Sequence, residues 1–261
     1  FGSPFRVEAE VAALSDGRAS RAMIPMENNR VGRVADIHQL LPEADLYIVG
    51  EHYQPIAHRL LGVPGATVDG LRTVHSHVQA LAQCHRYLSG LGVRPVVEAD
   101  TAGAAKDVAD RGDGSAAAIA SSLAGELFGL EALARDIADS AENTTRFIVL
   151  ARERVTPHPA DGPTITTILF KVRSVPAALY KALGGFATNG VNLTKLESYL
   201  LGDRFAVAQF YADIEGHPED EPVRLALEEL RFFSEWLQVL GTYPAHPFRT
   251  SLADPAAPPP G

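Results

Sequence analysis

Three neighbouring side chains, Thr145, Arg146 and Phe147, stand directly before the apolar run 148–150. The threonine hydroxyl can donate or accept a hydrogen bond, the guanidinium group can bind a carboxylate through two parallel hydrogen bonds, and the phenyl ring supplies an apolar wall. Polar residues at the mouth of a strand are where α/β folds place their chemistry. These residue types suit the removal of water from a small dianionic acid. The alternative is a helix-to-strand turn capped by Asn143 and Thr144.

The elements expected to position these residues alternate between strands and helices. Short apolar runs predict strands, and apolar residues spaced three or four apart predict helices. The predicted strands cover 21–26, 46–51, 71–74, 94–98, 116–119 and 148–150, and the predicted helices cover 7–14, 34–41, 78–89, 102–109 and 121–128. Ser76 with Gln79 predicts a capping box at the start of the helix 78–89, and Asp100 with Thr101 is predicted to cap the helix 102–109. Cys84 falls in the middle of the helix 78–89, in an apolar context that favours the core. The alternation predicts a mostly parallel α/β sheet with ligand sites at the carboxyl ends of its strands.

The pattern changes after a polar linker rich in Pro and Gly, residues 157–163. The predicted order is then strand, helix, strand, strand, helix, strand, over 164–172, 176–186, 191–200, 204–214, 219–233 and 236–240. Pro176 opens the first of these helices, and Asn189 with Gly190 ends it. This βαββαβ order is typical of the ferredoxin-like fold. The Ala/Pro-rich residues 244–261 are predicted to be a disordered tail.

Composition excludes several classes of protein. The chain has 261 residues, 46% of them hydrophobic, and a formal net charge of -9, which disfavours nucleic acid as a partner. No apolar run is long enough to span a membrane, and no secretory signal opens the sequence. The single cysteine, Cys84, excludes an internal disulfide and fits a reducing compartment, so we expect a cytoplasmic protein. No metal-ligand spacing, phosphate loop or dinucleotide fingerprint is present, and we expect no cofactor.

Six short segments, taken in order, resemble those of the prephenate dehydratase family. They are 24–29, 49–52, 75–77 with 83–84, 100–105, 145–147, and 176–179 with 197–198. The resemblance implies an α/β catalytic domain over 1–156, the linker 157–163, a ferredoxin-like ACT regulatory domain over 164–243 and the tail 244–261. It also implies that the catalytic domain has two lobes around a cleft, like type II periplasmic binding proteins. One lobe would hold residues 1 to about 50 and 145–156, and the other about 58–140.

The implied activity is the dehydration and decarboxylation of prephenate to phenylpyruvate in L-phenylalanine biosynthesis. The implied catalytic residues are Thr145, Arg146 and Phe147, with the Thr145 hydroxyl as donor to the leaving group. Because a threonine hydroxyl is a poor acid, Glu27 or Glu51 is a candidate proton source behind it; the alternative is that both are structural acceptors. The expected substrate-binding residues are Glu27, Asn28, Asn29, Ser76, Thr101, Ala102 and Gly103.

Two cationic features are expected to bind the substrate's carboxylates. One is Arg146, whose alternative role is a structural salt bridge. The other is the helix N-terminus at 101–103, where unpaired N–H groups and the helix dipole favour an anion. Its alternative is an ordinary capped helix. His75 and His77 are interpreted as solvated or capping side chains.

The ACT resemblance implies L-phenylalanine as an allosteric effector and self-association through the ACT domains into a dimer or tetramer. The expected effector-binding residues are Ala177, Ala178, Leu179, Asn189, Leu193, Glu197 and Ser198. The alternative is ferredoxin-like packing without a ligand. For the whole chain, the alternatives are arogenate as substrate, or a non-catalytic amino-acid sensor on the same scaffold.

The sequence departs from the family pattern at four places. Asn29 stands where a Ser is usual, Ala177 where a Gly is usual, and Tyr199 with Leu200 where Arg-Pro is usual. The chain also begins at Phe1 rather than Met, so we expect that the family's first strand and glycine-rich loop are missing from it.

Overall fold

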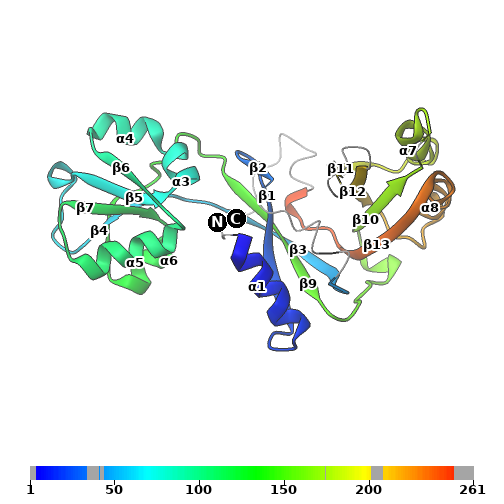
Figure 1. Ribbon diagram of the computed structural model, residues 1–261, viewed down its shortest axis with the longest axis horizontal. Coiled ribbons are helices and arrows are strands. Elements are labelled where there is room, and N and C mark those ends of the chain that lie inside the picture. The colour runs from blue at the N-terminus through cyan, green and yellow to red at the C-terminus, as the bar shows by residue number, and fades with distance from the viewer. Residues whose placement is uncertain (1–3, 34–40, 42–43, 174, 201–207, 250–261) are drawn as a thin grey trace. The chain divides into compact units, whose positions relative to one another are not determined.

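A computed structural model describes residues 4–33, 41, 44–173, 175–200 and 208–249. Residues 34–40 of the predicted helix 34–41 and residues 204–207 of the predicted strand 204–214 lie outside the described residues. The chain divides into two compact units (Figure 1). Unit 1 comprises Phe1–Val7, Pro25–Ala35 and Gln54–Arg146, and unit 2 comprises Glu8–Ile24, Asp36–Tyr53 and Phe147–Gly261.

Unit 1 contains a five-stranded sheet in the order β6-β5-β7-β4-β8. Its strands are β4 (Arg59–Gly62), β5 (Thr73–His77), β6 (Arg94–Glu98), β7 (Ala116–Ala120) and β8 (Glu131–Ala134). β5 pairs in parallel with β6 and β7, whereas β4 pairs antiparallel with β7 and β8. The sequence pattern does not predict β4 or β8, because four residues are too few to establish a period.

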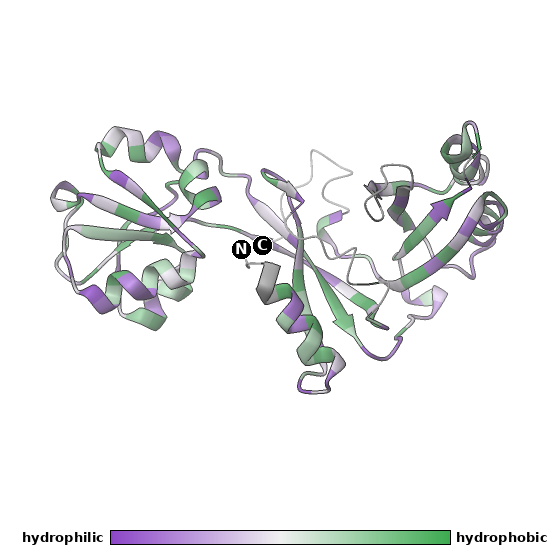
Figure 2. Cartoon of the chain, in the orientation of Figure 1, coloured by the Kyte–Doolittle hydropathy of each residue, from purple (hydrophilic) through white to green (hydrophobic). Residues whose placement is uncertain are grey.

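Helices cover both faces of this sheet (Figure 1). They are α3 (Val78–Gln83), α4 (His85–Leu91), α5 (Thr101–Arg111) and α6 (Ser122–Phe128), and a 3-10 turn, η1, covers Val68–Gly70. All five residues of β7 are buried, and they alternate between two cores. Ala117 and Ile119 pack with residues of α3 and α4, while Ala118 packs with residues of α5 and α6. Figure 2 shows hydrophilic as well as hydrophobic bands on α5, as expected of a helix with one buried face.

Two predictions near α3 are wrong in detail. The predicted helix 78–89 breaks at Cys84, which ends α3 and precedes α4, and its side chain is buried in the core. His77, not Ser76, caps α3, because the His77 ring accepts the Gln79 N–H. The Ser76 hydroxyl instead donates to the Ile119 carbonyl at 2.6 Å and is fully buried. Ser76 therefore ties β5 to β7, and its role in substrate binding stays a prediction.

A second sheet has the order β2-β1-β9-β3. Its strands are β1 (Arg21–Asn28), β2 (Gly32–Arg33), β3 (Tyr47–Pro55) and β9 (Thr144–Ala151), and helix α1 covers Pro4–Ser15. β9 begins at Thr144, four residues before the predicted strand 148–150. Thr145, Arg146 and Phe147 therefore lie within the strand rather than in a loop that precedes it.

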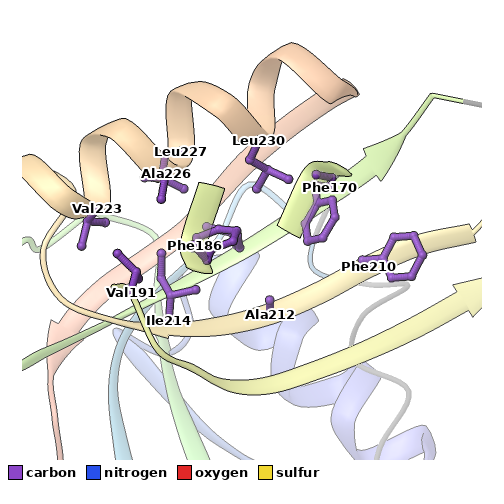
Figure 3. Packing of buried hydrophobic residues seen from close by; sticks show 12 residues of the cluster. Phe170, Phe186, Val191, Phe210, Ala212, Ile214, Val223, Ala226, Leu227 and Leu230 are labelled. Atoms are coloured by element: carbon purple, nitrogen blue, oxygen red, sulfur yellow. The ribbon is translucent and has the colours of Figure 1, made fainter. Parts of the chain in front are cut away.

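The C-terminal part of unit 2 has the predicted βαββαβ order. It contains β10 (Thr164–Val172), α7 (Ala178–Thr188), β11 (Leu193–Leu200), β12 (Ala208–Glu215), α8 (Glu221–Phe233) and β13 (Ser234–Pro244). The strands form an antiparallel sheet in the order β11-β12-β10-β13, and a 3-10 turn, η2, covers Pro159–Asp161 in the preceding linker. Figure 3 shows Phe186 of α7 and Leu230 of α8 beside Phe170 of β10 in its core.

Residues 245–249 are not a disordered tail as predicted. Arg249 donates to both carboxylate oxygens of Glu51 in β3, at 2.6 and 2.8 Å, and Phe248 stacks on Tyr53 with ring centroids 4.8 Å apart. The side chain of Glu51 is completely buried. The composition of this stretch suggested disorder, but its few large side chains have specific partners on β3. Residues 250–261 lie outside the described residues.

Candidate functional site

Two pairs of side chains bridge the neighbouring strands β1 and β9. Asn28 donates to the Thr145 hydroxyl oxygen at 3.0 Å, and Arg146 donates to Glu27 at 3.0 Å. Successive residues of a strand point to opposite faces. The Asn28–Thr145 pair therefore lies on one face of the sheet and the Glu27–Arg146 pair on the other. Joint action of Thr145 and Arg146 on one ligand stays a prediction.

The orientation of the Asn28 side chain follows from two backbone groups. The N–H groups of Arg30 and Val31 donate to Asn28 Oδ1 at 2.9 and 3.1 Å. Because a backbone N–H can only donate, Oδ1 must be the acceptor, and Nδ2 must face the other way. Asn28 Nδ2 then donates to Thr145 Oγ1 and to Asn143 Oδ1 at 2.8 Å. Thr145 accepts from Asn28, so its own proton is directed to a different group.

The directions of the hydrogen bonds can be followed from Asn28 into α3. Since Asn143 Oδ1 accepts from Asn28, Asn143 Nδ2 must face Gln83, and it donates to Gln83 Oε1 at 3.0 Å. His58 Nε2 lies 2.6 Å from the same oxygen. Gln83 Oε1 accepts, so His58 must carry its proton on Nε2. Burial lowers the pKa of His58, which keeps its imidazole neutral at pH 7.

This network borders a pocket in unit 1. The pocket has a volume of about 410 Å³ and is lined by Arg30, Val31, Gln79, Ala82, Gln83, Ala138, Asp139, Ser140 and Asn143. Asn28, Asn143 and Thr145 are each at most 4% exposed, so little water competes with their hydrogen bonds. The side-chain amides of Gln83, Asn143 and Asn28 thus connect the pocket to the Thr145 hydroxyl.

Arg146 is not an unoccupied cation. It is only 2% exposed, and its guanidinium is engaged by Glu27 in β1. The structure contains the structural salt bridge that was the alternative role predicted for Arg146. The Glu27 side chain is 33% exposed, whereas the Glu51 side chain is buried beside Arg249. Both glutamates accept hydrogen bonds from arginines in this geometry, and a role for either as the proton source behind Thr145 stays a prediction.

The N-terminus of α5 already holds a carboxylate. Asp100 caps it by accepting the Gly103 N–H at 2.7 Å. A second anion at Thr101, Ala102 and Gly103 would meet the negative charge of Asp100 and would lack that N–H group. The geometry favours the ordinary capped helix over the predicted carboxylate site.

Two further polar residues have structural partners. Asn29 accepts the Thr144 N–H at 2.9 Å, which joins the loop after β1 to the start of β9. His75 is buried and lies 2.9 Å from Glu98, so it is neither solvated nor a cap. His77 is a cap, as expected. Phe147 is half-buried in β9.

The predicted effector residues do not gather in one place within a single chain. Asn189 is at the C-terminal end of α7, where it donates to the Gly185 carbonyl at 2.8 Å. Ala177, Ala178 and Leu179 lie at the other end of this helix, about 16 Å away along 11 residues. The remaining three residues are on β11: Leu193 packs against the core of Figure 3, Glu197 contacts Lys195, and Ser198 points to the opposite face from Glu197.

Ala177 occupies a backbone conformation that favours glycine. Its φ and ψ are 58° and 26°, in the left-handed region. A side chain there clashes with the following carbonyl oxygen and costs roughly 1–2 kcal/mol. This explains in physical terms why a Gly is the usual residue at this position, and why Ala177 is a departure.

Three residues of the network were not among the predicted ligands. Gln83 is noted in the sequence as part of the segment 83–84, which carries the family resemblance, and of the predicted helix 78–89, and Asn143 is noted as a capping residue. His58 falls outside the predicted elements. The segment 83–84 is the available signal for Gln83. Among the described residues, no group of three or more His, Cys, Asp or Glu could hold a metal ion, and no helix is long and apolar enough to cross a membrane.

Comparison with known proteins identifies relatives of this chain. A sequence model of prephenate dehydratase matches residues 5–155. A bifunctional N-acyl-homoserine lactone acylase/prephenate dehydratase of Komagataeibacter europaeus is 53% identical over 239 residues, which are 92% of this chain and 85% of that protein. Arogenate dehydratase/prephenate dehydratase 2 of Arabidopsis thaliana is 42% identical over 86% of this chain. This chain spans only 61% of that plant protein.

Solved structures agree with the sequence matches. A protein described as GqqA, a novel type of quorum quenching acylase, has a TM-score of 0.86 and 54% identity, over 92% of this chain and 87% of that one. A prephenate dehydratase from Arthrobacter aurescens in complex with L-Phe has a TM-score of 0.80 and 30% identity, over 92% of this chain and 79% of that one.

Proposed function

Because this chain belongs to the prephenate dehydratase family, a family of lyases, we propose that it converts prephenate to phenylpyruvate, carbon dioxide and water. The observation that carries the proposal is the orientation of Thr145. Its oxygen accepts the Asn28 amide, so its proton is available to a substrate oxygen. The donor role that the resemblance implies for Thr145 is thus consistent with its hydrogen bonding.

The reaction needs a donor at the leaving hydroxyl group. The ring carboxylate leaves as carbon dioxide, its bonding electron pair moves into the ring, and the ring hydroxyl departs with a proton as water. A positioned proton donor typically contributes about 10²–10⁴-fold to such a step. A threonine hydroxyl is too weak an acid to supply a net proton alone, so Thr145 acts as a hydrogen-bond donor or relay. The Glu27–Arg146 pair on the opposite face fixes the strand that carries it.

Turnover of prephenate by the purified chain tests this proposal. We expect phenylpyruvate to form, and we expect Thr145→Ala to lower kcat by about 10²-fold or more while the far-UV circular dichroism spectrum stays unchanged. Thr145→Ser keeps the hydroxyl and should retain most of the activity. Unchanged turnover by Thr145→Ala would contradict the role of this hydroxyl, and no turnover by the unaltered chain would contradict the activity itself.

We further propose that the C-terminal βαββαβ part is an ACT domain that binds L-phenylalanine and mediates self-association. Support comes from the relative solved with L-Phe, which is 30% identical and matches 92% of this chain. We expect the candidate effector residues at the start of α7 and on β11 to form one pocket where two copies of the chain associate. Calorimetric titration with L-phenylalanine and its effect on prephenate turnover test the proposal. If L-phenylalanine neither bound to the chain nor changed prephenate turnover, the effector proposal would be contradicted.

Arogenate is an alternative substrate, because a relative that is 42% identical is named for both arogenate and prephenate. The two compounds differ by one amino group in place of a keto group. A comparison of kcat/KM for the two substrates on one preparation decides between them.

A second candidate activity is hydrolysis of N-acyl-homoserine lactones. The relative named for this activity as well as prephenate dehydratase is 53% identical over 92% of this chain. Unit 1 also has a largely apolar pocket of about 530 Å³, with a lining that includes Val78, Leu81, Leu88, Val93 and Val97, which is suited to an acyl chain. Release of homoserine lactone from an acylated substrate tests this candidate. Intact substrate after prolonged incubation would exclude it.

A further inference from the structure

The largely apolar pocket of about 530 Å³ lies between α3, α4 and β6, the strand at the end of the unit 1 sheet (Figure 1). Leu81 and Leu88 form its floor, since they are only 7% and 5% exposed. Val78 and Val97 also line it but are 53% and 63% exposed, so they lie at its rim. Exposed apolar side chains gathered around one concave surface mark a site that an apolar ligand can cover.

Two polar side chains of α4 belong to the same lining. His85 and Ser89 are one helical turn apart, and Ser89 Oγ lies 3.5 Å from His85 Nε2. Both side chains are exposed, so they can reach a ligand at the rim. A hydroxyl and an imidazole together offer a donor and an acceptor. An amide group needs this combination, because its carbonyl oxygen accepts and its N–H donates, whereas a carboxylate needs donors alone.

The edge of β6 is poorly suited to pairing with another strand. Pro95, which lines the pocket, has no N–H to donate, and its neighbour Arg94 is exposed and charged. Proline and exposed charges are the features by which natural edge strands avoid pairing. The pocket beside β6 is therefore better matched to a small molecule than to a strand of a second copy.

We propose that this pocket binds an N-acyl amide, with the acyl chain against the leucine floor and valine rim and the amide group at His85 and Ser89. The inference rests on the second candidate activity, since a relative that is 53% identical over 92% of this chain is named for N-acyl-homoserine lactones. It deepens that activity by assigning the acyl chain and the amide to separate parts of one pocket. Burial of each methylene group against an apolar wall should lower Kd about fourfold.

Calorimetric binding of N-butanoyl-, N-hexanoyl- and N-octanoyl-homoserine lactone to the purified chain tests the assignment of the acyl chain. We expect Kd to fall about 16-fold from each ligand to the next, because each step adds two methylene groups. Val97→Lys places a charge at the rim and should weaken N-octanoyl binding about tenfold or more. Leu127→Lys is the matched control, because Leu127 is 69% exposed but lies on α6, outside the pocket lining.

Octanoate, which has the same chain without an amide, tests the polar end of the pocket. Ser89→Ala should weaken all three acyl amides by a similar factor and leave the Kd of octanoate unchanged, since it removes a contact to the amide and not to the chain. If Ser89→Ala weakened octanoate as much as the amides, the assignment of the amide group would be overturned. Equal Kd values for the three chain lengths, or no binding at all, would overturn the whole inference.

Release of homoserine lactone by the same proteins separates this inference from the candidate activity. If binding depends on chain length and on Val97 but no homoserine lactone is released, the pocket stands and the activity fails. If homoserine lactone is released equally by Val97→Lys and Leu127→Lys, the activity stands and the pocket is overturned. Light scattering tests the other occupant. If Val97→Lys, but not Leu127→Lys, dissociates the chain, a second copy covers the pocket and the inference is overturned.

Discussion

At the scale of the residue, the direction of its hydrogen bond, more than its residue type, determines whether Thr145 can donate to a substrate oxygen. Asn28→Asp is nearly isosteric, but it replaces the donating Nδ2 group with a carboxylate oxygen. Thr145 would then donate to the new carboxylate and no longer to a substrate oxygen. We expect kcat for prephenate to fall about 10²-fold, with a lower thermal midpoint because Asn143 loses its donor. Wild-type kcat in this variant would show that Asn28 does not determine the direction of the Thr145 proton.

Ala177 allows a test of backbone strain without loss of contacts, because its side chain is exposed. Ala177→Gly should raise the free energy of unfolding by about 1 kcal/mol, since glycine adopts positive φ without a steric cost. The matched control is Ala187→Gly, at an exposed position within α7, which should lower stability because glycine is a poor helix former. Urea unfolding of the three proteins measures both effects. If Ala177→Gly lowered the free energy of unfolding as much as Ala187→Gly does, backbone strain at Ala177 would be contradicted.

At the scale of the element, the sequence predicts what has a long or repeated pattern and misses what depends on partners. The βαββαβ order and most helices of unit 1 are predicted because their apolar spacing runs over many residues. The start of β9 at Thr144 is missed, because polar Thr145 and Arg146 are buried only through their partners on β1. The break at Cys84 and the ordered residues 245–249 are likewise invisible to local patterns. Of the candidate site, the sequence singles out Thr145 as a polar residue at the mouth of a strand, but not the amides that orient it.

The segment after β13 should contribute strongly to the stability of unit 2. Arg249→Met would leave the fully buried carboxylate of Glu51 without its bidentate partner. Removal of one partner from a buried ion pair costs about 3–5 kcal/mol. Arg154→Met is the control, since Arg154 is exposed, donates to the Val239 carbonyl at 3.2 Å and lies over the Tyr47 ring at 5.6 Å, and we expect a loss below about 1 kcal/mol. Thermal unfolding of both variants measures the difference. Equal midpoints would mean that residues 245–249 do not stabilise unit 2.

At the scale of the whole molecule, the proposed self-association needs an exposed surface that a second copy of the chain could cover. β11 is at the end of its sheet, with a described neighbour only in β12, and Leu196 on it is 41% exposed. A strand edge next to an exposed apolar side chain is a favourable surface for pairing with a second copy. We expect the chain to be a dimer or larger in light scattering, and Leu196→Lys to weaken association at least tenfold. Phe232→Lys is the control, because Phe232 is also apolar and 67% exposed but lies on α8. If the two variants dissociate equally, or if the unaltered chain is a monomer, association through β11 is excluded.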